Sequence, residues 1–235
     1  MRILVLADIH ANWPALRAIA RAEPDCDECL VLGDLVDYGV SAREVIRWVQ
    51  AHASQVIRGN HDHAVAQFIR RRPHVSGLKQ FLNETRQIHW QELNCSELNY
   101  LGGLPTQLTL YRDGLKLRLL HATPRDPLGE YLLPDVTRWE EPTRNLQADI
   151  LLVGHTHIPF EIECHGLRIV NPGSVGQPRD GIASASYAVL EQGHVEFKRI
   201  AYDYTETLTD LSAAGISEES LVLARKILEP GTIDQ

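Results

Sequence analysis

The sequence contains no run of apolar residues long enough to span a bilayer. The first residues, MRILVLADIH, include a short apolar stretch that ends at Asp8. This stretch is too short for the hydrophobic core of a signal peptide. We therefore interpret it as a first β-strand and expect a soluble, cytoplasmic protein without a membrane partner.

The sequence also lacks an excess of basic residues. Its 31 acidic and 23 basic side chains give a formal net charge of −8 at pH 7. This balance argues against a nucleic-acid binder that relies on a broad basic surface. A local positive site remains compatible with it, because bound metal ions do not enter a count of side chains.

Cysteine is scarce. Cys26 and Cys29 have the C-x-x-C spacing of zinc and redox sites, and Cys95 and Cys164 stand alone. No second C-x-x-C follows, and Cys29 begins the apolar run CLVLG. We favour strand-associated cysteines without a function, which a cytosolic chain would keep reduced.

No internal repeat, low-complexity segment or linker divides the chain. Apolar strands alternate with helices in the first third, with strands in 2–7, 29–33 and 54–59 and helices in 12–22 and 41–52. This pattern predicts βαβ units and a parallel sheet that is covered on both faces. Ser41 and Glu44 predict a capping box at the start of the second helix.

The rest of the chain is predicted to be helical first and then rich in strands. Residues 61–103 read as mainly helical, with breaks near Pro73 and at Gly102–Gly103. Further strands are expected in 106–122, 148–154, 160–171, 186–191 and 194–202, with turns at Asp113–Gly114, His165–Gly166 and Gln192–Gly193. Two helices around Gly215 complete residues 205–229.

These elements predict an α/β (α+β) fold. Two mixed β-sheets would pack face to face with helices outside, as a four-layer αββα sandwich. Because no linker separates the two halves, we expect residues 1–235 to form a single domain.

Metal-binding residue types follow the predicted strands at the points where the strands end. Ligands of open α/β sheets bind at the carboxyl ends of strands, so these side chains are expected to lie together. Seven are candidate ligands: Asp8, His10, Asp34, Asn60, His121, His155 and His157. Mixed Asp, Asn and His ligands suit manganese, which we favour, or iron, zinc, nickel or cobalt. Seven groups are too many for one four-coordinate zinc and suit two divalent transition-metal ions that share a carboxylate.

The stretch ILLVGHTHIPF at 150–160 contains two of these candidates. Side chains two residues apart in an extended segment point the same way, so His155 and His157 would aim both imidazoles at one place. Imidazole is the commonest protein ligand for transition metals. The alternative is a pair of exposed loop histidines.

The order of these motifs resembles that of a known family. The motifs D-x-H, G-D-x-x-D, G-N-H-D, a lone histidine and G-H-T-H follow one another as in the calcineurin-like metallophosphoesterases, and the resemblance covers residues 2 to about 200. The segment NPGSVGQPRDG at 171–181 is similar to the small prokaryotic phosphodiesterase branch. The family fold, a β-sandwich flanked by helices, agrees with the fold predicted above.

The resemblance implies a role for each residue of the motifs. One metal would be held by Asp8, His10 and His157, the other by Asn60, His121 and His155, and Asp34 would bridge both. A hydroxide between the metals would attack the phosphorus atom, and His61 would protonate the leaving group, with Asp37 orienting His61. Two departures from the family pattern, Ala11 and Ala122 where glycine is common, affect only how closely backbone and substrate approach.

The implied activity is hydrolysis of a small phosphodiester or phosphomonoester, and a nucleotide remains a candidate substrate. One alternative is a non-catalytic metal-binding scaffold or interaction module of the same fold, as in the retromer-subunit branch. The intact ligand set and acid favour an enzyme. A nuclease, as in the break-repair branch, is disfavoured by the acidic charge and the short chain.

The sequence leaves several points open. Arg125 and Arg179 flank motif loops and are candidates for phosphate contacts, although an ordinary solvated arginine is the simpler interpretation of each. The remaining histidines are interpreted as surface or structural residues: His52, His63, His74, His89, His165 and His194. The motifs carry no expectation for the physiological substrate, for a preference between monoesters and diesters, or for the oligomeric state.

Overall fold

The computed structural model describes residues 1–70 and 76–229 of the 235-residue chain. The strands of this part are β1 (Arg2–Leu6), β2 (Glu28–Val31), β3 (Gln55–Val56), β4 (Gln107–Arg112), β5 (Leu115–Leu120), β6 (Ile150–Leu152), β7 (Phe160–Cys164), β8 (Leu167–Asn171), β9 (Ala185–Glu191) and β10 (His194–Ile200). Its helices are α1 (Trp13–Ala22), α2 (Ala42–His52), α3 (Asn60–Ala66), α4 (Leu78–Glu92), α5 (Cys95–Gly103), α6 (Val136–Thr143), α7 (Tyr204–Ala213) and α8 (Glu218–Leu228).

The strands form two mixed sheets of five strands each. The first has the order β10-β9-β1-β2-β3, in which β1, β2 and β3 are parallel and β9 pairs antiparallel with β1. The second has the order β4-β5-β6-β8-β7, in which β5, β6 and β8 are parallel. Both sheets therefore contain parallel strands whose carboxyl ends can share one edge.

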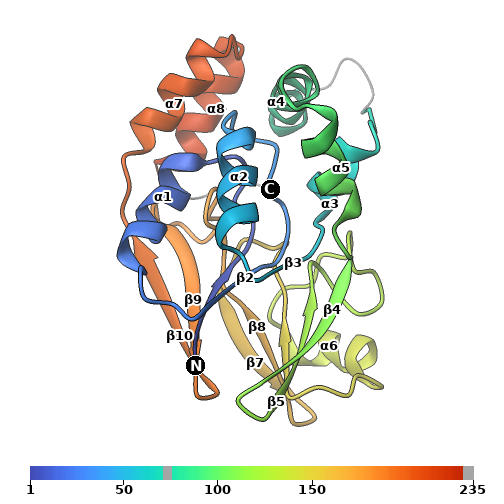
Figure 1. The fold of residues 1–235 in the computed structure, drawn as a ribbon. Helices are drawn as coiled ribbons and strands as arrows, with labels where there is room; N and C mark the ends of the chain where they lie inside the picture. Colours follow the sequence, from blue (N-terminus) through green and yellow to red (C-terminus); the bar gives the residue numbers. More distant parts are fainter. Residues whose placement is uncertain (71–75, 230–235) are drawn as a thin grey trace.

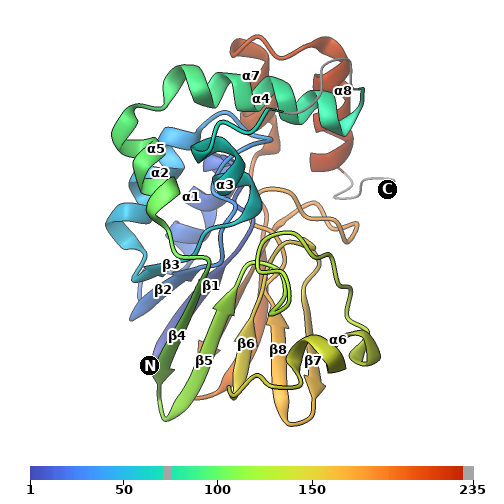
Figure 2. The same cartoon turned by 90° about the vertical axis from the view of Figure 1, so that its right-hand side faces the viewer.

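The sheets pack against each other, and helices cover their outer faces (Figure 1, Figure 2). In β1, Ile3 and Val5 pack in one core with Leu117 of the second sheet. The alternate residues Leu4 and Leu6 pack in the core beneath α1 and α2. This alternation explains why the strand is apolar throughout, since both of its faces are buried. The predicted four-layer αββα sandwich is confirmed.

The chain beyond the last strand forms part of a third cluster. Helices α7 and α8 gather with α4 above the sheets (Figure 2). Leu208, Leu211 and Ile227 are buried there against Phe81 and Tyr38. The two C-terminal helices thus lie close to the loop that follows β2.

The structure confirms the predicted hairpins at Asp113–Gly114, His165–Gly166 and Gln192–Gly193, and the two helices around Gly215. In each hairpin both turn residues have positive φ, which glycine adopts without steric cost. Local turn chemistry was therefore sufficient to place these strands.

Other predicted details are wrong. Ser41 occupies the N-cap position of α2, but its side chain makes no capping hydrogen bond, so the predicted capping box with Glu44 is absent. Its ψ of 43° differs from the extended conformation that aims a hydroxyl at the helix amides. The third strand is only two residues long, and α6 was not predicted. The predicted break near Pro73 lies outside the described residues.

The structure contains neither a membrane-spanning helix nor a disulfide within the described residues. Among the described residues, no helix is both long and apolar enough to cross a membrane. All four cysteines are free, including Cys26 and Cys29 of the C-x-x-C motif.

Candidate metal centre

The candidate ligands lie on loops that leave the carboxyl ends of strands from both sheets. Asp8 and His10 follow β1, and Asp34 follows β2. His121 directly follows β5, whereas Asn60 begins α3 shortly after β3. The loop after β6 contributes the last two candidates, His155 and His157. The structure brings all seven together, because the shared sheet edge collects these loops.

The first cluster consists of Asp8, His10 and His157, all at most 2% exposed. The Nε2 atoms of His10 and His157 are 3.2 Å apart, and His157 Nε2 is 3.6 Å from Asp8 Oδ1. The other ring nitrogens are engaged with the main chain. Nδ1 of His10 donates to the Val36 carbonyl and Nδ1 of His157 to the Gln177 carbonyl. Each neutral ring therefore turns a lone pair on Nε2 toward the cluster.

The second cluster consists of Asp34, His121 and His155. Nε2 of His121 is 3.2 Å from Asp34 Oδ2 and 3.0 Å from the amide oxygen of Asn60. Nδ1 of His121 donates to the Leu32 carbonyl, so Nε2 of the neutral ring is again an acceptor. In this neutral form two acceptor oxygens lie within 3.2 Å of an acceptor nitrogen, and a positive charge between them, either a proton on Nε2 or a cation, would remove their repulsion.

Asp34 lies between the two clusters. Its Oδ1 accepts from the main-chain N–H of His61, whereas its buried Oδ2 has no hydrogen-bond partner in the described part of the chain. This Oδ2 is 3.9 Å from His10 Nε2 on one side and 3.2 Å from His121 Nε2 on the other. A buried, unpartnered carboxylate oxygen is costly unless a cation compensates it. The residues present therefore fit a metal site that includes Asp34.

The titration behaviour of the cluster points in the same direction. Burial alone would raise the pKa of the Asp34 carboxyl, but the imidazoles of His121, His61 and His10 hold it well below its usual range. Burial opposes a charge on His121, yet the Asp34 and Asp8 carboxylates raise its pKa to about 10. Without a metal ion, His121 therefore holds an additional ring proton, which compensates the charge of the Asp34 carboxylate. The centre therefore attracts a positive charge in either state.

His61 lies beside the clusters and forms a different set of contacts. Its Nδ1 donates to Asp37 Oδ2 over 2.7 Å, and its Nε2 is 3.9 Å from Asp34 Oδ2. A third cluster of possible ligands, His10, Asp34 and His61, overlaps the first two. The structure thus places the His61 imidazole in contact with the Asp37 carboxylate.

Asp37 is held by two residues of α4 that the sequence analysis missed. The guanidinium of Arg86 donates to both Asp37 oxygens, and Nε2 of His89 accepts from the Asp37 main-chain N–H. Burial would raise the pKa of Asp37, but the facing His61 and Arg86 lower it to about 2. Asp37 therefore remains an anion next to His61. His89 has a structural role, as expected, but one that supports the centre.

Asp62 is a second missed residue. Its carboxylate is fully buried and accepts from the main-chain N–H groups of Asp34, Leu35 and Gly59. These contacts tie the loop after β2 to the start of α3. The available signal was its position as the third residue of α3, where an acidic side chain commonly accepts from the chain that enters the helix.

The geometry of the H-T-H segment differs from the expectation. His155 and His157 have φ values of 68° and 61°, so the segment is left-handed at both histidines and is not an extended strand. Both side chains nevertheless reach the centre, His155 in the second cluster and His157 in the first. Ala11, where the resemblance leads us to expect glycine, also has a positive φ of 49°. Alanine adopts this conformation at some cost, which glycine would avoid.

Residues 1–194 match the family model of the calcineurin-like phosphoesterase superfamily domain. The chain belongs to this superfamily. Its membership supports a phosphoesterase activity that depends on metal, and the clustered His and Asp residues are able to bind one.

Similar proteins match most of the chain. An uncharacterized protein of Methanocaldococcus jannaschii is 31% identical over 225 residues, which cover 86% of this chain and 88% of that protein. The phosphodiesterase YfcE of Escherichia coli K12 is 25% identical over 204 residues, covering 81% and 88%. The crystal structure of a metallophosphoesterase from Sphaerobacter thermophilus aligns with a TM-score of 0.84 and 29% identity over 99% of both chains.

The two arginines left open by the sequence differ in this phosphoesterase fold. Arg125 forms ion pairs with Glu130 and Glu141, and its side chain is 52% exposed. Arg179 donates to the side-chain oxygen of Gln177, and its main-chain N–H donates to the His157 carbonyl. Only Arg179 is thus connected directly to a proposed metal ligand.

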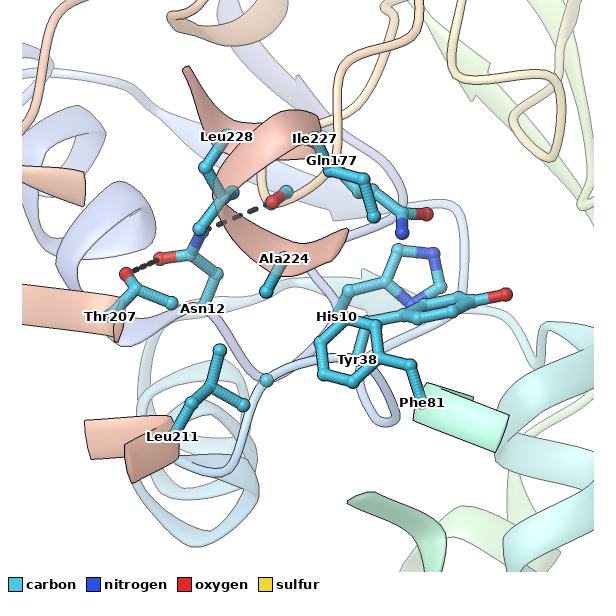
Figure 3. Close-up of a pocket in the computed structure, with 12 residues that line it drawn as sticks. His10, Asn12, Tyr38, Phe81, Gln177, Thr207, Leu211, Ala224, Ile227 and Leu228 are labelled. Carbon is cyan, nitrogen blue, oxygen red and sulfur yellow. Dashed lines mark hydrogen bonds between the residues drawn. The ribbon is translucent and has the colours of Figure 1, made fainter. Parts of the chain in front are cut away.

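A cavity of about 20 Å³ adjoins the centre at His10 (Figure 3). Its walls are Tyr38, Gln177, Phe81 and apolar residues of α7 and α8. Asn12 ties these parts together, because it accepts from Thr207 and donates to the Gly176 carbonyl. The C-terminal helices, which follow the residues matched by the family model, therefore help to enclose one side of the centre.

Proposed function

We propose that this protein is a phosphoesterase that depends on two divalent metal ions and hydrolyses small phosphodiesters or phosphomonoesters. One ion would be held by Asp8, His10 and His157, the other by Asn60, His121 and His155, and Asp34 would bridge both. Manganese is the favoured metal. Membership of the calcineurin-like phosphoesterase superfamily supports the class of reaction. The phosphodiesterase YfcE among the relatives supports a phosphate-ester substrate.

One observation carries the proposal. The Asp34 Oδ2 atom is buried and lies 3.9 Å from His10 Nε2 and 3.2 Å from His121 Nε2, and when both rings are neutral it has no hydrogen-bond partner in the described residues. Acceptor atoms repel one another unless a cation lies among them. A site for one ion on each side of Asp34 accounts for this arrangement.

The residues around the centre have complementary parts in the proposed reaction. When bound, the ions would lower the pKa of a water to near neutrality and offset the charge of the phosphoryl oxygens. His61 would donate a proton to the departing oxygen. Asp37 accepts from His61 Nδ1, which leaves Nε2 to carry the transferred proton. Arg86 fixes Asp37 and so fixes the orientation of His61.

The experiment combines metal analysis with a substrate panel. Purified protein is stripped with a chelator and reloaded with manganese, nickel or magnesium, and bound metal is measured by elemental analysis. We expect about two ions per chain. Hydrolysis of aryl phosphate mono- and diesters should follow loading and should be faster with manganese or nickel than with magnesium, because imidazole ligands suit borderline metals.

Two outcomes would contradict the proposal. A chain that binds no metal after loading would remove its basis. A chain that binds metal but hydrolyses none of the esters would favour the metal-binding scaffold.

We further propose that residues 1–235 act as one domain. Helix α7 contacts α1, helix α8 contacts α4, and both helices line the cavity beside His10.

A further inference from the structure

Arg179 is a cation without an anionic partner beside the metal centre. In the described part of the chain it forms no ion pair, and its buried Nε has no hydrogen-bond partner. The adjacent carboxylate of Asp180 is engaged with Arg199 instead. The main-chain N–H of Arg179 donates to the His157 carbonyl, and its Nη2 donates to Gln177, whose main-chain carbonyl accepts from His157 Nδ1, so Arg179 lies next to the first cluster.

Gln177 presents a second unpartnered donor. Its side chain is buried, with the residue 1% exposed, and its Nε2 has no partner among the described residues. The amide orientation is defined, because Oε1 accepts from Arg179 Nη2 over 3.1 Å. In Figure 3 the amide nitrogen is turned toward the imidazole of His10. A buried N–H without an acceptor is costly, and an acceptor at this point would remove the cost.

We propose that Gln177 and Arg179 form a binding site for the non-bridging oxygens of the substrate phosphoryl group, on the side of the centre formed by His10 and His157. Guanidinium and amide N–H groups suit this ligand, because an arginine fork forms charge-assisted bonds to phosphate oxygens. The inference rests on the proposed function. It also assigns a preference, since an added cation favours the dianion of a monoester over the single charge of a diester.

The contacts of Gln177 explain how the site is positioned. Its main-chain carbonyl accepts from His157 Nδ1, while its side-chain oxygen holds the Arg179 guanidinium. The same residue therefore orients a proposed metal ligand and a proposed phosphate ligand. A side-chain substitution at Gln177 leaves the main-chain contact in place, so the two roles can be separated.

Arg125 supplies the matched control. It lies on the loop that follows His121, but Glu130 and Glu141 already neutralise its charge. The test compares Arg179→Met, Arg179→Lys, Gln177→Leu and Arg125→Met with the unchanged protein, all loaded with manganese. Bound metal is measured first, and the dissociation constant of inorganic phosphate is then measured by calorimetry.

We expect Arg179→Met to bind phosphate about 10- to 100-fold more weakly, as the loss of a charge-assisted contact predicts. Arg179→Lys should recover part of the loss, and Gln177→Leu should lose less than Arg179→Met. Metal content should stay at the level of the unchanged protein in all variants, and Arg125→Met should bind phosphate normally. The KM for an aryl phosphomonoester should rise more in Arg179→Met than the KM for the matching diester.

Phosphate binding within twofold of the unchanged protein in Arg179→Met would overturn the inference. A loss of phosphate binding that follows a loss of metal would overturn it too, because Arg179 would then support the metal ligands alone. The titration needs no turnover. A protein that hydrolyses no ester but loses phosphate affinity in Arg179→Met would refute the proposed function and leave this site supported.

Discussion

Replacing His61 with alanine should separate acid catalysis from metal binding. His61 Nε2 is 3.9 Å from Asp34 Oδ2, and its Nδ1 is directed at Asp37. The main-chain N–H of residue 61, which donates to Asp34 Oδ1, is retained in the variant. We therefore expect metal content to stay near two ions per chain while one proton donor is lost.

The size of the effect should depend on the leaving group. A positioned general acid contributes about 10²- to 10⁴-fold in rate, which corresponds to about 3–5 kcal/mol of barrier. An alkyl phosphate leaves as a poor alkoxide and should lose the full factor. A nitrophenolate leaves as a stable anion and should lose less than about tenfold. The assay measures kcat/KM for both esters, with metal content determined on the same samples.

The matched control is His63→Ala, two residues further along α3, where within the described residues the imidazole is hydrogen-bonded to Arg58. It should change neither rate nor metal content. The division of roles is refuted if His61→Ala slows both esters equally and also loses metal. His61 would then act as a ligand through its cluster with His10 and Asp34.

Three further substitutions test other parts of the centre and fold. Asp34→Asn removes the proposed bridging charge at constant shape, and elemental analysis should find fewer than about two ions per chain, with hydrolysis lost in parallel. Arg86→Ala leaves the buried Asp37 carboxylate without its guanidinium, so urea unfolding should report a loss of about 3–5 kcal/mol, whereas an unchanged midpoint would refute the pairing. Glu23 is buried, which would raise its pKa, but bonds from Lys198, Arg2 and Tyr187 lower it. A lowered folded pKa stabilises the protein above the unfolded value of about 4.3. Glu23→Gln should therefore be less stable at pH 7, and the difference in unfolding free energy should shrink as the pH falls below about 4.

The position of the centre could be predicted because it depends on a rule of topology. Parallel strands end at one sheet edge, so Asp8, Asp34 and His121 follow β1, β2 and β5 into the same region. The strands themselves were recognisable from their apolar runs and from the turn residues between them. These signals are local, and a single sequence displays them.

The support around His61 could not be found in this way. Arg86 and His89 are about fifty residues from Asp37 in the sequence, and no local pattern connects them. One signal was available: Arg86 and His89 fall on the same face of α4 as the buried Phe81 and Leu82. Polar residues on an apolar helix face need buried partners, although the helix alone does not identify them.

The backbone conformation of the ligand loops was also beyond the sequence. Positive φ values occur at five proposed ligands: Asp8, His10, Asp34, His155 and His157. Aspartate visits this region more readily than most residues, and histidine is enriched there too, but each such residue costs stability unless its surroundings compensate it. A left-handed residue turns the chain sharply, so the side chains reach the centre from tight loops. Strand alternation predicted that the side chains of His155 and His157 lie at the same centre. The backbone that brings them there is left-handed and not extended, so the reason given for the prediction was wrong.

The charge around the centre explains how an acidic protein can bind a phosphate ester. Arg86 offsets the charge of Asp37, and three main-chain N–H groups bond to Asp62, which leaves Asp8 and Asp34 as the carboxylates that face the proposed ions. Two divalent ions would exceed these two charges by about two, and Arg179 adds to the excess. At physiological salt, charges more than about 8 Å apart are largely screened, so the excess acts only near the centre. A small phosphate ester would meet this local positive charge, whereas the further phosphates of a long polyanion would be repelled by a protein with a formal net charge of −8. The excess of acidic side chains that disfavours a nucleic-acid partner is therefore compatible with a small anionic substrate.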